Sequence, residues 1–149
     1  MSMIIRRAAP ADAVALCDLY HNHLTSNPPS ELQDMAVWRE KISRFAEDPL
    51  YHLLVGEVDG QIVSSVTVIL IENLTRNLRP YALIENVVTH SGHRGKGYGA
   101  KVMNRASKTA EEFGCYKIML MTGSGNEAFD FYEKCGLNRN DKTAFIRWL

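Results

Sequence analysis

The apolar positions in the first fifty residues predict a strand followed by two helices. Residues 3–8 (MIIRRA) have the length and apolar content of a short strand. Pro10 followed by Asp12 is typical of a helix start. The expected inner face of this helix consists of Val14, Cys17, Tyr20 and Leu24. A second helix should follow residues 26–31 (SNPPSE), with Ser30 as its cap. Its predicted apolar stripe is Met35, Trp38, Ile42 and Phe45.

The middle of the chain predicts a hairpin and then a strand, a glycine stretch and a helix. Two strand-like runs, residues 51–58 and 61–71, are separated by Asp59 and Gly60, a pair typical of a two-residue hairpin turn. Residues 82–90 (ALIENVVTH) predict the next strand. The helix after the glycine stretch should end at Gly114. Its expected inner face is Val102, Met103, Ala106, Ala110 and Phe113.

Three further elements are expected towards residue 149. These are a buried strand at 116–122 (YKIMLMT), a short helix within 126–136 (NEAFDFYEKCG) and a final strand within 142–149 (KTAFIRWL). The predicted order is therefore β-α-α-β-β-β-α-β-α-β. An antiparallel front half joined to a βαβ unit indicates a mixed α/β sheet with helices on both faces. No repeat or linker interrupts the pattern, so residues 1–149 are expected to form a single domain.

Composition narrows the classes of function. The apolar fraction of 46% and charged fraction of 23% are typical of a soluble globular protein. Seventeen basic residues balance seventeen acidic ones, which favours neither a nucleic-acid nor a membrane partner. Neither a signal peptide nor a membrane-spanning run is apparent. The three cysteines (Cys17, Cys115 and Cys135) lack metal-ligand spacing, so free thiols in the cytoplasm and no metal site are expected.

The stretch HSGHRGKGYGAK, residues 90–101, combines glycines with positive charge before a helix and so suggests an anion site. A nucleoside-triphosphate loop is excluded because it needs Gly-Lys-Ser/Thr, and Gly97 precedes Tyr98. A dinucleotide fingerprint fits Gly95, Gly97 and Ala100, but the next strand ends without the acidic residue that would hold a ribose. A glycine-rich turn with solvated basic residues is the purely structural alternative.

The remaining interpretation takes Arg94, Gly97 and Gly99 as R-x-x-G-x-G, and a second pattern, F-Y-x-K-x-G, ends at Gly136. With these two motifs in this order, nearly the whole chain resembles the GCN5-related N-acetyltransferase (GNAT) family. The resemblance implies a splayed central sheet and acetyl-CoA as cofactor, with its phosphates on the glycine loop. The implied cofactor-binding residues are Val87, Val88, Thr89, Arg94, Gly95, Lys96, Gly97, Tyr98, Gly99, Ala100, Asn126 and Tyr132.

The same resemblance implies how the reaction centre is built. The strand before the loop should carry a bulge and splay from its parallel neighbour, so that the pantetheine arm can lie between them. A backbone N–H near Val88 would then stabilise the negative charge on the acetyl oxygen. Tyr132 would protonate the departing sulfur, although its position also suits an ordinary core aromatic residue. Glu85 would act as a base or order a water, although it also suits a solvated or ion-paired carboxylate.

The acceptor is less well defined by the sequence. The chain is similar to small-molecule acetyltransferases, including glucosamine-6-phosphate N-acetyltransferases, but those tend to carry Glu-Asp where this chain has Glu85 and Asn86. A primary amine of a small molecule is therefore predicted as the acceptor. Specificity should come from residues 21–34 and 72–82, which contain His21, His23, Arg76 and Arg79. The alternative is that all four are ordinary surface residues.

Two further expectations concern the molecule as a whole. A homodimer is predicted, with residues 142–149 exchanging or abutting across a two-fold axis through Phe145, Ile146 and Trp148, unless these residues close the chain's own core. The alternative to an enzyme is a non-catalytic acyl-CoA-binding or sensing module of the same fold. Asn126 and Tyr132 favour the enzyme, because a sensor needs no acid beside the sulfur.

Overall fold

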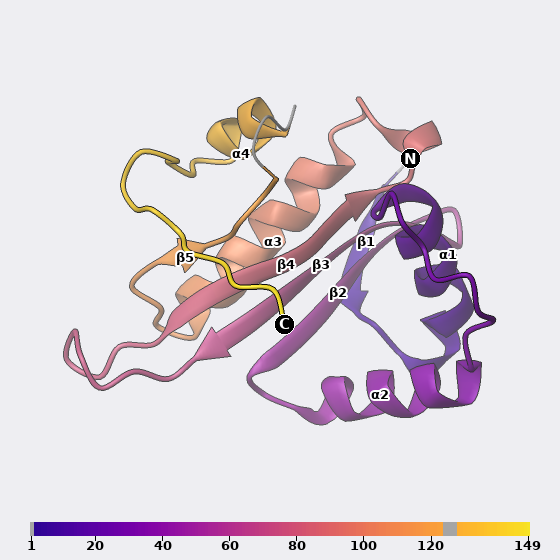
Figure 1. Ribbon diagram of the computed structural model, residues 1–149, viewed down its shortest axis with the longest axis horizontal. Helices are drawn as coiled ribbons and strands as arrows, with labels where there is room; N and C mark the ends of the chain where they lie inside the picture. Colours follow the sequence, from indigo (N-terminus) through magenta and orange to yellow (C-terminus); the bar gives the residue numbers. More distant parts are fainter. Residues whose placement is uncertain (1, 124–127) are drawn as a thin grey trace.

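The computed structural model describes residues 2–123 and 128–149, and Figure 1 shows its arrangement. The elements in chain order are β1 (Ile4–Arg7), η1 (Pro10–Asp12), α1 (Ala13–His23), α2 (Met35–Glu47), β2 (Tyr51–Val58), β3 (Gln61–Ile71), β4 (Tyr81–Thr89), η2 (Ser91–His93), α3 (Tyr98–Glu112), β5 (Ile118–Met119) and α4 (Phe129–Lys134). The strands form one sheet in the order β1-β2-β3-β4-β5, antiparallel except for the parallel β4–β5 pair. The predicted mixed α/β sheet is confirmed.

Alternating side chains divide the sheet into two apolar faces, as period-2 geometry requires. One face, which includes Leu54 of β2 and Val66 of β3, packs against α3. The opposite face, which includes Leu53 and Val55 of β2, packs against α1 and α2. Figure 1 shows α3 and the α1–α2 pair on the two sides of the sheet. Helix α4 joins the α3 side, because Phe131 packs against that cluster.

The first helices differ in detail from the sequence prediction. A 3₁₀ turn occupies Pro10–Asp12, and α1 then buries Ala13, Leu16 and Leu19 rather than the predicted face. Val14 is consequently 58% exposed. The cap of α2 is Asp34, whose carboxylate accepts a hydrogen bond from the Ala36 N–H at 2.8 Å. Capping by Ser30 was therefore a wrong prediction. The predicted stripe of α2 is confirmed, since its members pack on the α1–α2 side of the sheet.

The hairpin and the long helix follow the sequence prediction. Asp59 and Gly60 connect β2 to β3 with φ angles of 50° and 79°, the left-handed values that this turn requires. Helix α3 buries the predicted inner face with one exception. Phe113 is 39% exposed, because the helix ends at Glu112 and the chain turns away through Gly114, whose φ is 88°.

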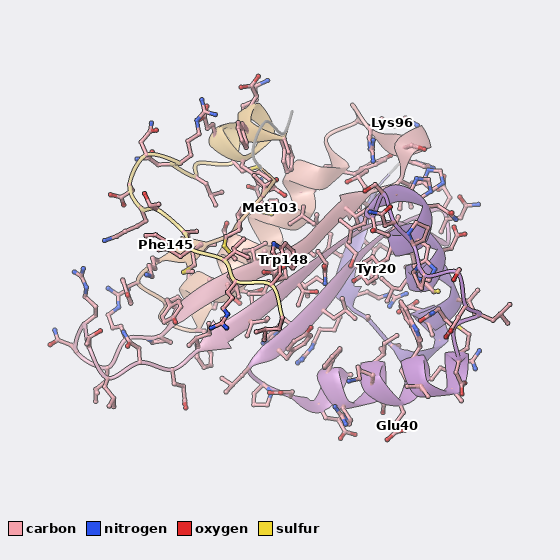
Figure 2. All side chains as sticks on the ribbon, in the orientation of Figure 1. Tyr20, Glu40, Lys96, Met103, Phe145 and Trp148 are labelled. Carbon is pink, nitrogen blue, oxygen red and sulfur yellow. The ribbon has the colours of Figure 1, made fainter. Side chains whose placement is uncertain are left out.

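Two strand predictions near residue 149 are wrong. The expected strand at 116–122 shrinks to the two residues of β5, which are only partly buried or exposed. Residues 142–149 form neither a helix nor a strand, and most of their apolar side chains face solvent. Figure 2 shows Phe145 and Trp148 projecting from this segment. The apolar pattern there is strand-like, but this chain provides no strand to pair with it among the residues described.

Candidate active site

The site lies where β4 and β5 separate. The two strands pair only at Ala82 with Ile118 and at Leu83 with Met119. Beyond this point β4 contains a bulge, because two steps along β3 from Ser65 to Thr67 oppose three steps along β4. Asn86 lies in the bulge with a φ of 52°. A bulge bends its strand, so the outer edge of β4 from Glu85 onward is open among the described residues.

The glycine loop opens the long helix α3. Gly97 is the N-cap residue with a φ of 80°, and Gly95 has a φ of 74°, so both need the conformational freedom of glycine. A Cβ atom at either position would meet no atom within 4 Å, which leaves the space above the loop free. The first intrahelical bond is donated by the Lys101 N–H to the Gly97 carbonyl at 3.1 Å. The preceding backbone N–H groups are therefore available to an anion at the positive end of the helix dipole.

Gly99 is required for packing instead. A Cβ at this position would lie 3.2 Å from both the Phe131 ring and the Thr89 hydroxyl oxygen. The glycine thus lets α3 approach both β4 and α4. Thr89 is held in place by the Ser64 hydroxyl, whose oxygen lies 2.9 Å from its own.

The other residues of the loop have divided roles. Arg94 is turned away from the helix start and donates to the Thr89 carbonyl and the His23 carbonyl, each at 3.2 Å. Tyr98 is buried, so only its backbone is available to a ligand. Lys96 is exposed on the loop, as Figure 2 shows, and Lys101 follows one turn into the helix. Lys96 and Lys101 add positive charge beside the free N–H groups, and Arg94 also links this loop to β4 and α1.

Histidines connect the end of α1 to this loop. The rings of His23 and His90 lie 3.9 Å apart between centroids, and the Ser91 N–H donates to His23 Nδ1 at 3.2 Å. Burial lowers the pKa of His23, and the nearby His90 and Arg94 lower it further. His23 thus has a structural partner, whereas His21 lies against Cys17 and Trp38 on α1 and α2.

The two predicted catalytic side chains come from different elements and influence each other. Glu85 is half-buried on β4, opposite Thr67 of β3. Burial raises the pKa of the Tyr132 hydroxyl, and the charges of Cys135 and Glu85 raise it further. The pKa of Tyr132 therefore depends in part on the charge of Glu85. Asn126 lies outside the described residues.

The α1–α2 side of the sheet contains a pocket of about 380 Å³ that ends at this bulge. Its walls come from α1, α2 and β2, and its base comes from β3 and β4. The lining residues are Leu16, Tyr20, Val37, Trp38, Lys41, Ile42, Phe45, Tyr51, Leu53, Thr67 and Asn86. The sequence analysis missed this pocket, because the apolar spacing on α2 indicates only that its residues face the sheet.

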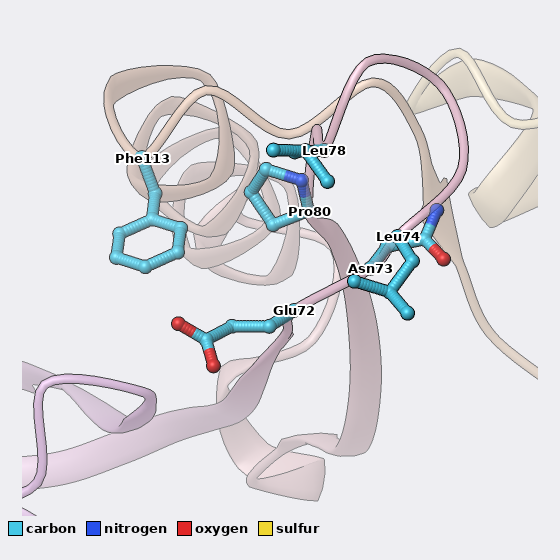
Figure 3. Close-up of a pocket in the computed structure, with 6 residues that line it drawn as sticks. All are labelled: Glu72, Asn73, Leu74, Leu78, Pro80 and Phe113. Carbon is cyan, nitrogen blue, oxygen red and sulfur yellow. The ribbon is translucent and has the colours of Figure 1, made fainter.

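Figure 3 shows a wider, shallower hollow of about 730 Å³ at the other end of β4 and α3. It is lined by Glu72, Leu74, Leu78 and Phe113 among others and has no contact with the glycine loop. Arg79, from the same loop, donates to the Gly114 and Cys115 carbonyls at 3.2 and 3.0 Å. This end of the molecule is therefore separate from the proposed chemistry.

Two other features are absent from the described residues. No group of His, Cys, Asp and Glu side chains within residues 2–123 and 128–149 is arranged to hold a metal ion. No helix in the same ranges is both long and apolar enough to cross a membrane.

Comparison with known proteins agrees with this geometry. Residues 15–137 match the model of the Acetyltransferase (GNAT) family, so the chain belongs to this family. It is 32% identical to the glucosamine 6-phosphate N-acetyltransferase of Arabidopsis thaliana over 66% of this chain and 65% of that protein. The chain thus aligns with slightly less than two thirds of that relative.

Solved structures support the fold. A protein of Agrobacterium tumefaciens str. C58 assigned as an acetyltransferase is 38% identical, with 97% of this chain and 99% of that one covered at a TM-score of 0.84. The structure of the Arabidopsis thaliana glucosamine-6-phosphate N-acetyltransferase covers 99% of both chains at a TM-score of 0.85. Its identity of 24% supports the fold alone.

Proposed function

We propose that this acetyltransferase moves an acetyl group from acetyl-CoA to the primary amine of a small molecule by direct attack. The observation that carries the proposal is the combination of an uncapped helix start at Gly97 with a bulged, open β4 edge beside Glu85 and Tyr132. The family membership of the chain supports the same reaction. One domain, residues 1–149, would carry both the cofactor and the acceptor.

The residues present fit the cofactor. The free N–H groups after Gly97, the empty space above Gly95 and the charge of Lys96 suit the two phosphates of coenzyme A. The backbone of Val87 to Thr89 borders the open edge where the pantetheine arm would pair. Acetyl-CoA would supply the thioester that the amine attacks.

The backbone around the bulge offers a donor for the acetyl oxygen. The His90 N–H donates to the Val63 carbonyl at 2.8 Å, and successive backbone groups of a strand point to opposite sides. By this alternation the Val88 N–H would point towards β3, and that of Val87, the residue after Asn86 in the bulge, would be left for the open edge. We propose Val87 as the donor, a one-residue change from the sequence-based expectation. Such a donor contributes about 3 kcal/mol to the transition state.

Glu85 and Tyr132 would complete the proton transfers. Glu85 accepts a proton from the incoming ammonium group, which leaves the amine lone pair free to attack. Tyr132 carries its proton at neutral pH, since the usual pKa of a tyrosine is 10.0 and burial raises it further, and it gives that proton to the sulfur as the C–S bond breaks. The attacking nitrogen loses its second proton as the C–S bond breaks, and this proton replaces the one that Tyr132 gave to the sulfur. The product amide and the free thiol then leave, and Glu85 passes its proton to solvent.

Thiol release from acetyl-CoA, measured with a panel of primary amines, tests the reaction directly. We expect turnover with at least one amine and loss of about tenfold or more in kcat/KM in Glu85→Gln. Binding of acetyl-CoA without thiol release for any amine would contradict the enzyme and favour a sensing module.

We also propose that the protein is cytoplasmic. Cys17, Cys115 and Cys135 are all free thiols in the described structure, and burial raises the pKa of each. Free, protonated thiols suit a reducing compartment. Cell fractionation tests this location. The unmodified chain should be found in the soluble fraction together with cytoplasmic marker proteins.

Finally, we propose a homodimer in which residues 142–149 pair with a second copy. Their strand-like pattern has no partner strand within the described chain, and Phe145 and Trp148 are 94% and 90% exposed. β5 is the last strand of the sheet, and its outer edge in a second copy is unpaired among the described residues, so a two-fold arrangement would bury both segments at once.

A further inference from the structure

We infer that the acceptor amine is carried on an aromatic or bulky apolar body, which lies in the pocket between α1, α2 and the sheet. This inference rests on the proposed function and names the substrate class of the same site. It departs from the sugar phosphate named for the curated relatives.

The pocket walls are aromatic. Trp38 and Phe45 of α2, Tyr20 of α1 and Tyr51 of β2 surround it, and each is only partly buried. The Tyr20 and Trp38 rings lie 6.2 Å apart, and Phe45 stacks on Tyr51 at 3.9 Å between centroids. Four partly buried aromatic rings, of which Phe45 and Tyr51 are stacked, around a volume of about 380 Å³ form a site for an apolar body of a drug-like size.

The inner end of the pocket is polar and adjoins the reaction centre. The Tyr20 hydroxyl lies 3.4 Å from the Ser65 hydroxyl, and both Tyr20 and Tyr51 interact with the Thr67 side chain. Thr67 is opposite Glu85 across the strands, and the charge of Glu85 raises the pKa of Tyr51, which burial raises most. An amine placed at this end would meet hydroxyls and a carboxylate, while its body remains among the aromatic rings.

The pocket lacks the cations that a phosphate ester needs. Such a group carries more than one negative charge, and proteins hold it with clustered Arg and Lys side chains. Among the described residues, Lys41 is the single charged one that lines the pocket. The arginines raised as candidates from the sequence are engaged elsewhere, since Arg79 bonds carbonyls after α3 and Arg76 lies over the Tyr116 ring at 5.4 Å.

A paired substrate test addresses the inference. Steady-state thiol release is measured with 2-phenylethylamine and with glucosamine 6-phosphate on the full chain. We expect kcat/KM for 2-phenylethylamine to exceed that for the sugar phosphate at least about tenfold. Trp38→Ala should raise KM for 2-phenylethylamine about tenfold with little change in the Kd of acetyl-CoA. The matched control is Phe113→Ala, an aromatic residue in the remote hollow, which should leave KM unchanged.

A third variant separates the two acceptor classes without disturbing the core. Lys41 is exposed, so Lys41→Ala should fold normally. KM for the apolar amine should rise less in Lys41→Ala than in Trp38→Ala, because only packing against the lysine stem is lost, whereas a bound phosphate would lose its cation and its KM would rise strongly. Preference for glucosamine 6-phosphate with strong dependence on Lys41 overturns the inference and leaves the proposed function standing.

Saturation-transfer NMR measures the binding of 2-phenylethylamine and so distinguishes the remaining outcomes. Binding to the parent and loss of binding in Trp38→Ala, with no amine acetylated, would support the pocket assignment and contradict the proposed function. Turnover of other amines with no binding of 2-phenylethylamine would overturn the inference alone.

Discussion

Tyr132 shows how one side chain can satisfy both a structural and a chemical interpretation. Its ring packs against the α3 face of the sheet, as a core aromatic residue does, and lies 5.1 Å from the Phe131 ring. Its hydroxyl nevertheless has a raised pKa and interacts with the charge of Glu85. The ring explains why the residue is tolerated in the core, and the hydroxyl is the part available for proton transfer.

The Tyr132→Phe variant separates these two roles. It keeps the ring and removes only the proton donor, so kcat should fall about 10²-fold while the Kd of acetyl-CoA changes little. The control is Tyr116→Phe, whose ring lies against Lys117 and Arg76 away from the splay. Parent-like turnover in Tyr132→Phe, with melting temperature unchanged, would end the general-acid role.

Asp12 is a residue whose charge contributes to the stability of the fold. Its carboxylate accepts hydrogen bonds from Arg6 at 2.7 and 2.9 Å and from the Ala9 N–H at 2.8 Å, while Arg6 also bonds Glu57. Hydrogen bonds from Arg6 hold the pKa of Asp12 below its usual value of 3.8, although burial opposes this. Because the pKa of Asp12 is lower in the folded than in the unfolded chain, its carboxylate stabilises the fold at pH values above the unfolded-state pKa. This stabilisation is lost as the pH falls through the folded-state pKa.

We therefore expect Asp12→Asn to lower the free energy of unfolding by about 2 kcal/mol at pH 7. The difference between parent and variant should shrink as the pH falls below 4, since the parent carboxylate becomes protonated as well. Urea unfolding at pH 7 and at pH 3 measures both values. Asp130→Asn is a control on a short helix with no described ion pair. A difference in unfolding free energy between parent and Asp12→Asn that is equal at pH 7 and pH 3 would contradict stabilisation by the charge of Asp12.

Several residue-scale predictions could be made from the sequence because motif spacing places backbone features well. The glycines of the loop lie where R-x-x-G-x-G predicts them, and Gly97 opens the helix. Side-chain roles were harder to predict. Arg94 has the right position for a phosphate contact, but its guanidinium bonds the Thr89 and His23 carbonyls. The contact with His23 depends on α1, which is 71 residues earlier in the chain and cannot be located from the loop alone.

At the scale of elements, the start of α3 carries the cofactor hypothesis. Gly97→Val places a side chain in the space above the loop and strains a φ of 80°. The strain should cost about 1–2 kcal/mol of stability, and the side chain should weaken acetyl-CoA binding sharply. Calorimetric titration below the melting temperature gives the Kd.

The hairpin glycine provides the control for strain. Gly60 has a φ of 79° and also has free space at its Cβ position, but it lies in the β2–β3 turn. Gly60→Val should therefore lower the melting temperature by a similar amount and leave the Kd of acetyl-CoA unchanged. Equal weakening of binding in both variants would show that strain, rather than obstruction of the phosphates, is responsible.

Which elements could be predicted depends on where their information lies. The β2–β3 hairpin is defined locally by Asp59 and Gly60, so the sequence predicts it well. The length of β5 depends on β4, because β4 bends away after Leu83 and ends the pairing. The residues of β5 themselves carry no pattern from which this length could be predicted. The pocket is likewise a product of packing, because Trp38 and Phe45 have the spacing of core residues and the unfilled volume between α2 and the sheet has no sequence signature.

At the scale of the whole molecule, residues 142–149 are the feature that a single chain does not explain. Phe145, Ile146 and Trp148 are exposed, although such residues usually lose contact with water on folding. Burying three side chains of this size contributes several kcal/mol, which is enough to drive association if the backbone finds a strand to pair with. The open edge near β5 in a second copy offers one.

The chain should therefore have twice the 16.8 kDa mass of one copy in light scattering at micromolar concentration. Trp148→Asp together with Phe145→Asp should shift the mass towards that of one chain, because charges replace the apolar contacts and oppose burial. The matched control is Leu32→Asp, which alters an equally exposed apolar residue in the α1–α2 loop and should leave the dimer intact. A parent protein that stays at 16.8 kDa over a wide concentration range would contradict the dimer, and residues 142–149 would then remain exposed in solution.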